Sequence, residues 1–226
     1  MRYLESDMYG VISCCSLDLR RLGGDEVLFR QLCELTYAVQ SRRGKLRVER
    51  WGHSWRNMYV NRPRMRVNGL YFQRVSYIKR PERNMWYDGE AGNILECIYY
   101  RYLRFFRTGE VLYGISLQPP KQAAVLLTDV SSADVHQDVS VGEFEVLPGR
   151  RVQVSVRTDH GRVVLDLDID NGERGSFTRL KLNSHLQFPY SSNTGEAREL
   201  PILANVFKYR RLPIRTKPKF GYGRHI

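Results

Sequence analysis

Aspartates at alternate positions form the most chemically suggestive string in the sequence. Asp166, Asp168 and Asp170 present carboxylates at every second residue, a spacing that also occurs at the start of calcium-binding loops. Such a loop needs glycine at its sixth position and glutamate at its twelfth, whereas this string has Asn171 and Phe177 there. The intervening residues are apolar, so the pattern predicts a strand with one acidic face and no metal site.

The histidines do not form a catalytic motif with their sequence neighbours. They are dispersed along the chain, at His53, His136, His160, His185 and His225. The sequence also contains no GxSxG string and no glycine-rich loop between a strand and a helix, which nucleophilic catalysis and phosphate binding use. We therefore expect no active site and no cofactor, so the protein is predicted not to be an enzyme.

The cysteines have neither the CxxC spacing of a zinc site nor the even spread of a disulfide framework. They are Cys14, Cys15, Cys33 and Cys97. Glu5 and Asp7 stand where a signal peptide needs an apolar stretch, and no apolar run approaches the roughly 18 residues of a membrane helix. We expect a soluble protein of the cytoplasm or the nucleus, with no membrane partner.

Two segments carry the formal charge of +12. Residues 42–66 hold nine Lys or Arg and one acid, and the residues after Glu199 hold seven Lys or Arg and no acid. Such clusters attract phosphate backbones or acidic protein surfaces, but charge runs are more often solvated edges. A nucleic-acid-binding module is therefore an alternative, and nucleic acid is not the partner that we expect.

Aromatic residues and arginines are interleaved in the segment Cys97–Phe106, where Arg101 and Arg104 stand among tyrosines and phenylalanines. This composition can stack nucleic-acid bases. It is equally typical of a strand that is buried on both faces and whose arginine pairs with an acid of a neighbouring strand. We favour the structural interpretation.

The elements that must position these residues begin with a short helical part. Apolar residues recur at helical intervals after Asp25, which stands where an N-cap acceptor is needed, and this predicts a helix over 25–38. Ser54 is placed to cap a second, shorter helix. That helix must end before Arg62-Pro63, because the residue before proline avoids the α conformation.

Beyond Pro63 apolar and polar residues alternate, most clearly over 152–156 and 163–169, as they do in half-buried strands. Glycine turn signals separate the strands, at Asn68-Gly69, Thr108-Gly109, Pro148-Gly149, His160-Gly161 and Asn171-Gly172. Polar stretches predict three long loops, at residues 81–92, 129–140 and 190–198.

Roughly ten strands without a long helix to cover an open sheet favour closure of the sheet. We predict a mainly β fold, an antiparallel closed or nearly closed barrel with a lipocalin-like meander, preceded by a short α-helical part. The predicted domains are a helical region at 1–60 and a β domain at 61–226.

Two strings carry a family resemblance. The first is SWRNMY from Ser54, continuing as RPRMRVNGLY over Arg62–Tyr71, and the second is YYRYLRFF from Tyr99, leading to the turn Thr108-Gly109. Both are similar to strings that follow the F-box in the F-box only protein 9 family, and weaker similarity extends to Tyr209. The motif positions that we expect to be structural are Trp55, Arg62, Pro63, Arg64, Gly69, Tyr71, Tyr100, Arg101, Tyr102, Arg104, Phe105, Phe106 and Gly109.

The resemblance implies the substrate-recruiting receptor subunit of a Skp–cullin–F-box ubiquitin ligase, acting in ubiquitin-dependent proteasomal degradation. In such a ligase the F-box binds the Skp adaptor on its cullin core, the rest of the chain selects a target protein, and other subunits supply the chemistry. Residues 13–33 resemble only the last part of an F-box and lack its Leu-Pro helix. Within this partial F-box the resemblance implies Leu28, Phe29 and Leu32 as adaptor contacts.

Trp55 and Arg62-Pro63-Arg64 are expected to form the hinge between the helical part and the barrel, because Pro63 ends the helix and Asn68-Gly69 soon begins the first hairpin. The helical part should therefore pack on the barrel. A small-ligand carrier is a further alternative, since barrels of about eight or more strands can hold an apolar ligand. A barrel core filled by Tyr100, Tyr102 and Phe106 would leave no cavity for one.

Overall fold

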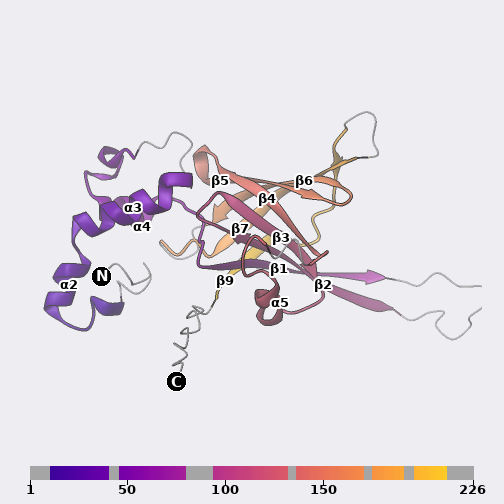
Figure 1. The fold of residues 1–226 in the computed structure, drawn as a ribbon, viewed down its shortest axis with the longest axis horizontal. Helices are drawn as coiled ribbons and strands as arrows, with labels where there is room; N and C mark the ends of the chain where they lie inside the picture. The colour runs from indigo at the N-terminus through magenta and orange to yellow at the C-terminus, as the bar shows by residue number, and fades with distance from the viewer. Residues whose placement is uncertain are drawn as a thin grey trace, which may run out of the picture.

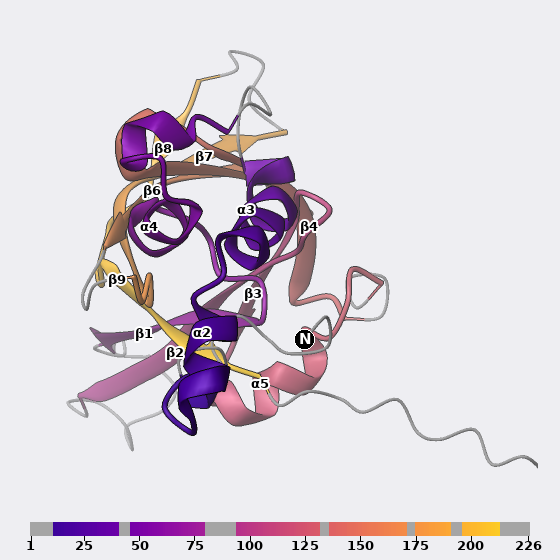
Figure 2. The same cartoon turned by 90° about the vertical axis from the view of Figure 1, so that its left-hand side faces the viewer.

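A helical part lies at one end of a β-barrel in the computed structural model of the chain (Figure 1). The structure describes residues 11–40, 46–79, 94–131, 136–170, 175–190 and 196–212. The helical elements are α2 (Leu17–Gly23), α3 (Glu26–Gln40), the 3-10 helix η1 (Val48–Trp51) and α4 (Trp55–Asn61). The two predicted helices are confirmed, and Figure 2 shows α3 and α4 in front of the barrel end.

Side-chain caps fix the starts of α3 and α4. Asp25 Oδ1 accepts a hydrogen bond of 2.9 Å from the Val27 N–H, and Ser54 Oγ accepts one of 3.1 Å from the Asn57 N–H. The Ser54 hydroxyl in turn donates to Glu26 Oε1 at 2.7 Å. Since each cap satisfies a backbone donor that the helix cannot, the carboxylate at the start of α3 also holds the start of α4.

Eight antiparallel strands close into a barrel, as predicted. Around the barrel their order is β6-β5-β4-β3-β2-β1-β9-β7, and β7 pairs again with β6. The short β8 pairs with β7 beyond β9, so the described residues form nine strands, close to the roughly ten that were predicted. The strands are β1 (Gly69–Lys79), β2 (Leu95–Phe105), β3 (Glu110–Ser116), β4 (Val139–Val146), β5 (Arg151–Thr158), β6 (Gly161–Asp170), β7 (Arg179–Pro189), β8 (Arg198–Glu199) and β9 (Val206–Arg211).

Two apolar clusters lie on opposite faces of the barrel wall. The larger is the barrel core, to which the inner faces of β1, β2, β3 and β5 to β7 contribute, and it includes Tyr71, Leu103 and Phe105. The smaller lies outside, where helix α5 (Pro120–Leu126) covers Tyr102 and Leu112. Apolar residues are therefore buried on both faces of β2.

Tyr100, Tyr102 and Phe106 do not fill the barrel. All three belong to the outer cluster under α5, while the alternate residues of β2 point inward. The cause is the period of two: once Leu103 and Phe105 face the core, their neighbours must face outward.

Glycines at positive φ form three of the predicted turns, at Gly109 (98°), Gly149 (79°) and Gly161 (140°). Asn68-Gly69 is not a hairpin turn, because Gly69 is the first residue of β1. Asn171-Gly172 and the predicted loop at 81–92 lie outside the described residues, as do parts of the loops at 129–140 and 190–198.

Candidate functional site

Arginines of the family motif join the helices to the barrel. The Tyr37 hydroxyl of α3 donates to the Arg62 carbonyl at 2.9 Å, and the Arg62 guanidinium lies 4.2 Å from the Tyr37 ring centre. The Arg64 guanidinium lies 4.0 Å from the Tyr59 ring and 4.9 Å from the Phe177 ring, and it donates to the Tyr59 carbonyl. Arg64 thus stacks on a ring of α4 and on a ring of the barrel core.

A buried glutamine adds a second link. Gln40, at the end of α3, donates through Nε2 to the Met65 carbonyl at 3.0 Å and accepts from the Met65 N–H at 2.8 Å. Its side chain is only 6% exposed, and Met65 belongs to the barrel core. Because a buried amide without partners is costly, this pairing fixes α3 to the barrel end.

Tyr71 completes the junction from the barrel side. Its ring is fully buried, its hydroxyl donates to the Phe177 carbonyl at 2.8 Å, and it accepts from the Arg66 N–H at 3.2 Å. The Arg66 guanidinium lies 4.4 Å from the Tyr209 ring and donates to the Ser176 carbonyl at 3.2 Å. The helical part therefore packs on the barrel, as expected.

Trp55 does not make this junction. It is half-buried and packs on the helical cluster, in which Phe29, Cys33, Tyr37, Met58 and Tyr59 are the buried members. The Arg30 guanidinium lies 5.7 Å from its ring. Of the residues expected at the hinge, Arg62, Pro63 and Arg64 lie in the connecting segment and Trp55 does not. In that segment Pro63 follows an extended Arg62 with φ of −72° and ψ of 124°.

The outward side of α2 and α3 exposes apolar side chains. Of the predicted adaptor contacts, Phe29 is buried in the helical cluster, while Leu28 and Leu32 are half-buried. The apolar residues of α2 and α3 that are more than half exposed are Leu17 (74%), Leu22 (52%), Val27 (62%) and Leu35 (61%). We call these four residues the helical apolar face. The sequence signal for it was the eight-residue spacing of Val27 and Leu35, which places both residues on one side of α3.

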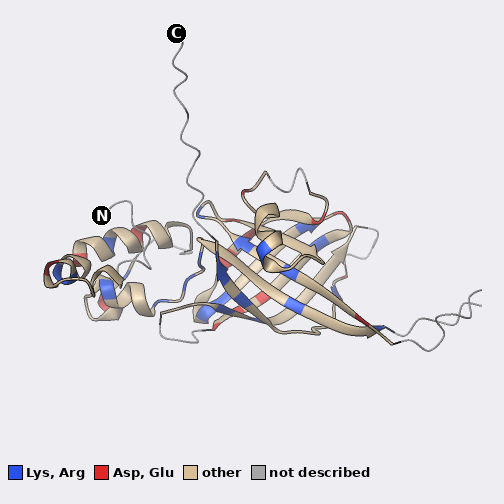
Figure 3. Ribbon diagram, turned by 90° about the horizontal axis from the view of Figure 1, so that it is seen from below, with Lys and Arg blue, Asp and Glu red and all other residues tan. Residues whose placement is uncertain are grey.

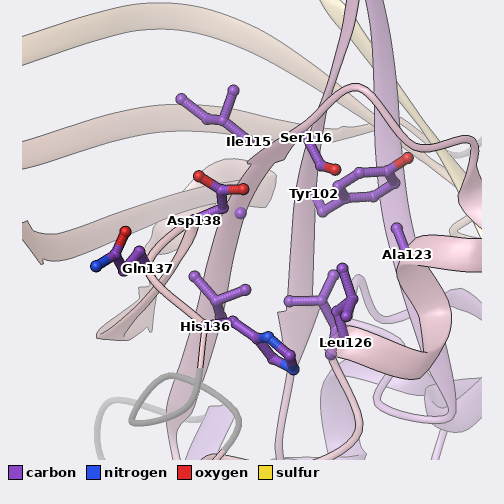
Figure 4. Close-up of a pocket in the computed structure, with 11 residues that line it drawn as sticks. Tyr102, Ile115, Ser116, Ala123, Leu126, His136, Gln137 and Asp138 are labelled. Carbon is purple, nitrogen blue, oxygen red and sulfur yellow. The ribbon is translucent and has the colours of Figure 1, made fainter.

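A pocket of about 410 Å³, which we call the side pocket, opens on the outer barrel wall beside α5 (Figure 4). Its lining combines apolar groups of α5 with polar groups of β3 and of the segment before β4: Tyr102, Gly114, Ile115, Ser116, Ala123, Leu126, Leu127, His136, Gln137, Asp138 and Val139. The Tyr102 hydroxyl donates to the Gln118 carbonyl at 2.5 Å. A largely apolar lining with a few polar groups is typical of ligand-binding pockets.

The remaining motif residues of β2 build the wall behind this pocket. Tyr100 stacks on Tyr102 with ring centres 6.1 Å apart, and the Arg104 guanidinium lies 5.1 Å from the Phe106 ring while donating to the Leu127 carbonyl. Phe105 faces the opposite way, into the core. β2 is thus buried on both faces, which is one half of the interpretation that we favoured for this segment.

Gly109 and Gly69 allow close approaches. A Cβ at Gly109 would lie 3.1 Å from Val39 Cγ1, so the β2–β3 turn lies against the end of α3. A Cβ at Gly69 would lie 2.3 Å from the Arg210 carbonyl oxygen of β9. Both motif glycines therefore stand where another part of the chain passes close to the backbone.

A layer of polar side chains lies inside the barrel. Gln73, Arg101 and His185 are buried, with exposures of 1%, 8% and 3%. The expected pairing of Arg101 with an acid is not found. Its Nη2 donates to the Tyr99 hydroxyl at 3.1 Å, and no carboxylate contacts it among the described residues. Sequence reasoning also missed His185 as a buried group.

His185 should make stability depend on pH. Burial, with the nearby positive charge of Arg101 as the second cause, lowers the pKa of His185 from 6.5 to about 4. Protons therefore bind the unfolded chain first, and about 3 kcal/mol of unfolding free energy should be lost as the pH falls from about 6.5 to about 4. Urea unfolding across this range should show that His185→Gln removes this loss. The exposed His53 provides the control: a His53→Gln variant that matched His185→Gln would contradict the assignment.

Neither a metal site nor a membrane-spanning helix is found among the described ranges. No group of three or more His, Cys, Asp or Glu residues there lies close enough to hold a metal ion. No helix in the same part of the chain is both long and apolar enough to cross a membrane.

Lys and Arg are spread over the helices, the junction and the barrel wall (Figure 3). Within the first basic segment, Arg62, Arg64 and Arg66 contact aromatic rings and backbone carbonyls. Their guanidinium groups serve the junction, which weakens the nucleic-acid alternative.

Comparison with protein families identifies the family of this chain. The family described as F-box only protein C-terminal region matches residues 44–206. This span runs from just before η1 to the first residue of β9, and it includes the junction, the side pocket and most of the barrel. The chain matches no solved structure.

Proposed function

The chain belongs to the F-box only protein C-terminal region family, and from that premise we propose that it is the substrate-recruiting receptor subunit of a Skp–cullin–F-box ubiquitin ligase. In this role it carries a target protein to the ligase and does no chemistry itself. Ubiquitin transfer by other subunits would mark the target for the proteasome.

The observation that carries the proposal is the helical apolar face on a part of the chain that is fixed to the barrel. Leu17, Leu22, Val27 and Leu35 are more than half exposed, and a group of exposed apolar side chains can mark a protein-interaction site. Gln40 holds α3, and Arg64 holds α4, against the barrel. A partner on the helices would therefore stand at a defined position relative to a target on the barrel.

The helical apolar face is the proposed binding site for the Skp adaptor. Val27 and Leu35 would contact the adaptor directly, with Leu28 and Leu32 at the border of the contact. Phe29 would not contact the adaptor. It packs on Tyr59 with ring centres 6.0 Å apart, and this packing would hold α3 in the position that exposes Val27 and Leu35.

The side pocket beside α5 is the proposed site for the target protein. It lies on the barrel wall, whereas the helices lie at the barrel end (Figure 1). Two partners bound at these sites would not compete for the same surface. The proposed location is the cytoplasm or the nucleus, where such ligases work; the four cysteines are free, as a reducing compartment would keep them.

Substitution of Val27 should separate adaptor binding from folding. A glutamate in the centre of an apolar contact leaves a charge without a partner, so Val27→Glu should lower recovery of the Skp adaptor with the affinity-purified full-length gene product about tenfold or more. Val125 of α5 is equally exposed, at 60% against 62%, and Val125→Glu should leave recovery unchanged. No adaptor with the parent protein, or equal recovery with Val27→Glu, would refute the proposed role of this face.

A further inference from the structure

We propose that the interior of the barrel binds a small oxyanion that carries a hydrogen-bond donor, at the layer formed by Gln73, Arg101 and His185. The proposal concerns a surface that neither the adaptor nor the side-pocket target would use. It stands without the ligase role.

The strand register places the three side chains in one region of the interior. Gln73 of β1 is paired directly with Arg101 of β2, and each is two residues from a member of the barrel core on the same strand. His185 of β7 is paired with Leu165, another core residue. All three therefore face inward.

Several polar atoms of this layer are buried without a hydrogen-bond partner among the described residues. They are Arg101 Nε, Arg101 Nη1, Gln73 Oε1 and His185 Nδ1. A guanidinium carries its charge at any physiological pH, and a buried charge without a counter-charge costs several kcal/mol. Such a group is explained when its counter-charge comes from a bound ion.

The pattern of donors and acceptors indicates the chemistry of the ligand. Arg101 offers N–H donors from two nitrogens, which suit the oxygens of an anion. Gln73 Nε2 donates to the Ala204 carbonyl at 2.7 Å, so its amide is held with Oε1 as the free acceptor. The ligand should therefore present anionic oxygens to Arg101 and an O–H or N–H to Gln73, as a hydrogen phosphate ion does.

Access is from the end of the barrel opposite the helices. At the helical end, Tyr71, Phe105 and Tyr209 pack edge to face, with ring centres 5.2 to 5.7 Å apart, and close the interior. Towards the other end, Tyr99 is half-buried and Ile115, the register partner of Arg101, is 43% exposed. Side chains next to Arg101 in this direction are therefore more exposed than Arg101 itself, and we place the route of access there.

Titration of the full chain with inorganic phosphate tests the proposal, with calorimetry at constant ionic strength and chloride as the reference anion. Sulfate is the matched control ligand, because it has similar oxygens but no O–H near neutral pH. Arg101→Met removes the proposed anion contact. Arg74→Met, on an exposed position of the same barrel region, is the control variant.

We expect phosphate to bind more tightly than sulfate, Arg101→Met to weaken it about tenfold or more, and Arg74→Met to leave it unchanged. Phosphate should also shift the ring resonances of His185 in the parent protein. Absence of phosphate binding to the parent, binding without a His185 shift, or equal binding by Arg101→Met would overturn the proposal, because each would mean an adventitious ion only or none. Equal affinity for sulfate would contradict the donor contact to Gln73.

A second measurement separates binding from a structural role. If Arg101 serves the anion, Arg101→Met should unfold at the same or a higher denaturant concentration than the parent in chloride, because a buried unpaired charge is removed. Phosphate should then stabilise the parent and not the variant. A variant that is destabilised equally in chloride and in phosphate would show that Arg101 only holds the fold.

Discussion

Replacing Tyr71 by alanine should lower the free energy of unfolding by about 4 kcal/mol, and replacing it by phenylalanine should lower it by about 1 to 2 kcal/mol. The alanine variant loses a fully buried ring that packs on Phe105 and Tyr209. The phenylalanine variant keeps the ring and loses only the hydroxyl. The Phe177 carbonyl and the Arg66 N–H would then each lose the hydrogen bond that Tyr71 makes.

Chemical denaturation of both variants measures these losses. Tyr113 is the matched control, since its ring is also buried in the core but its hydroxyl has no hydrogen bond to any described residue. Tyr113→Phe should therefore change stability by less than about 0.5 kcal/mol. Equal effects of Tyr71→Phe and Tyr113→Phe would show that the hydrogen bonds of Tyr71 do not stabilise the junction.

Gly69→Ala is the second substitution with a large expected effect, a loss of about 3 kcal/mol. An added Cβ would lie 2.3 Å from the Arg210 carbonyl oxygen and 2.5 Å from both Cζ and the hydroxyl oxygen of Tyr209. Backbone oxygen cannot move without separating β1 from β9, the two strands that are paired there. The barrel would have to open locally, next to the helical junction.

Gly114→Ala is its control, because Gly114 also lies within a strand but the nearest atom to an added Cβ is 3.5 Å away. That distance is ordinary contact, so stability should change little. Thermal unfolding of the two variants gives the comparison. A Gly69→Ala protein as stable as Gly114→Ala would mean that β1 and β9 are not closely paired at this position.

Local chemistry predicted the helix starts and the strand type. Asp25 and Ser54 cap the helices because short oxygen side chains satisfy orphan N–H groups wherever a helix begins. The alternation over 163–169 predicted β6 because one side of that strand faces the core. Closure of the sheet into a barrel was predicted from the number of strands and from the lack of a long helix to cover an open sheet.

Helix α5 was missed because it is only seven residues long, and only the proline at its start marked it. Its presence changes the interpretation of β2. With α5 over the outer face, both faces of β2 are apolar, so composition alone does not show which tyrosines enter the barrel. Tyr102 in fact belongs to the outer cluster and not to the barrel core.

The inward position of His185 depends on a feature with no sequence signal. Leu180 and Leu182 face the core, so strict alternation would place residue 184 inside and residue 185 outside. A register shift between Asp166 and Leu167 of the paired strand β6 changes this alternation, and His185 then lies opposite the core residue Leu165. A bulge of this kind is decided by pairing with the neighbouring strand. The layer that contains Arg101 was therefore not predictable as a site.

Protein half-lives in cells are the most direct test of the proposed receptor role. Ile78 of β1 is 68% exposed and belongs to neither the helical apolar face nor the side pocket, so Ile78→Glu is the control here. Cells that lack the gene would receive the parent protein, Val27→Glu or Ile78→Glu at equal abundance, and the half-lives of all other proteins would be compared. We expect a defined set of proteins to be long-lived without the gene and with Val27→Glu, and short-lived again with the parent or with Ile78→Glu. If no half-life depends on the gene, or if Val27→Glu restores turnover as well as the parent does, the chain is not a ligase receptor that works through its helical apolar face.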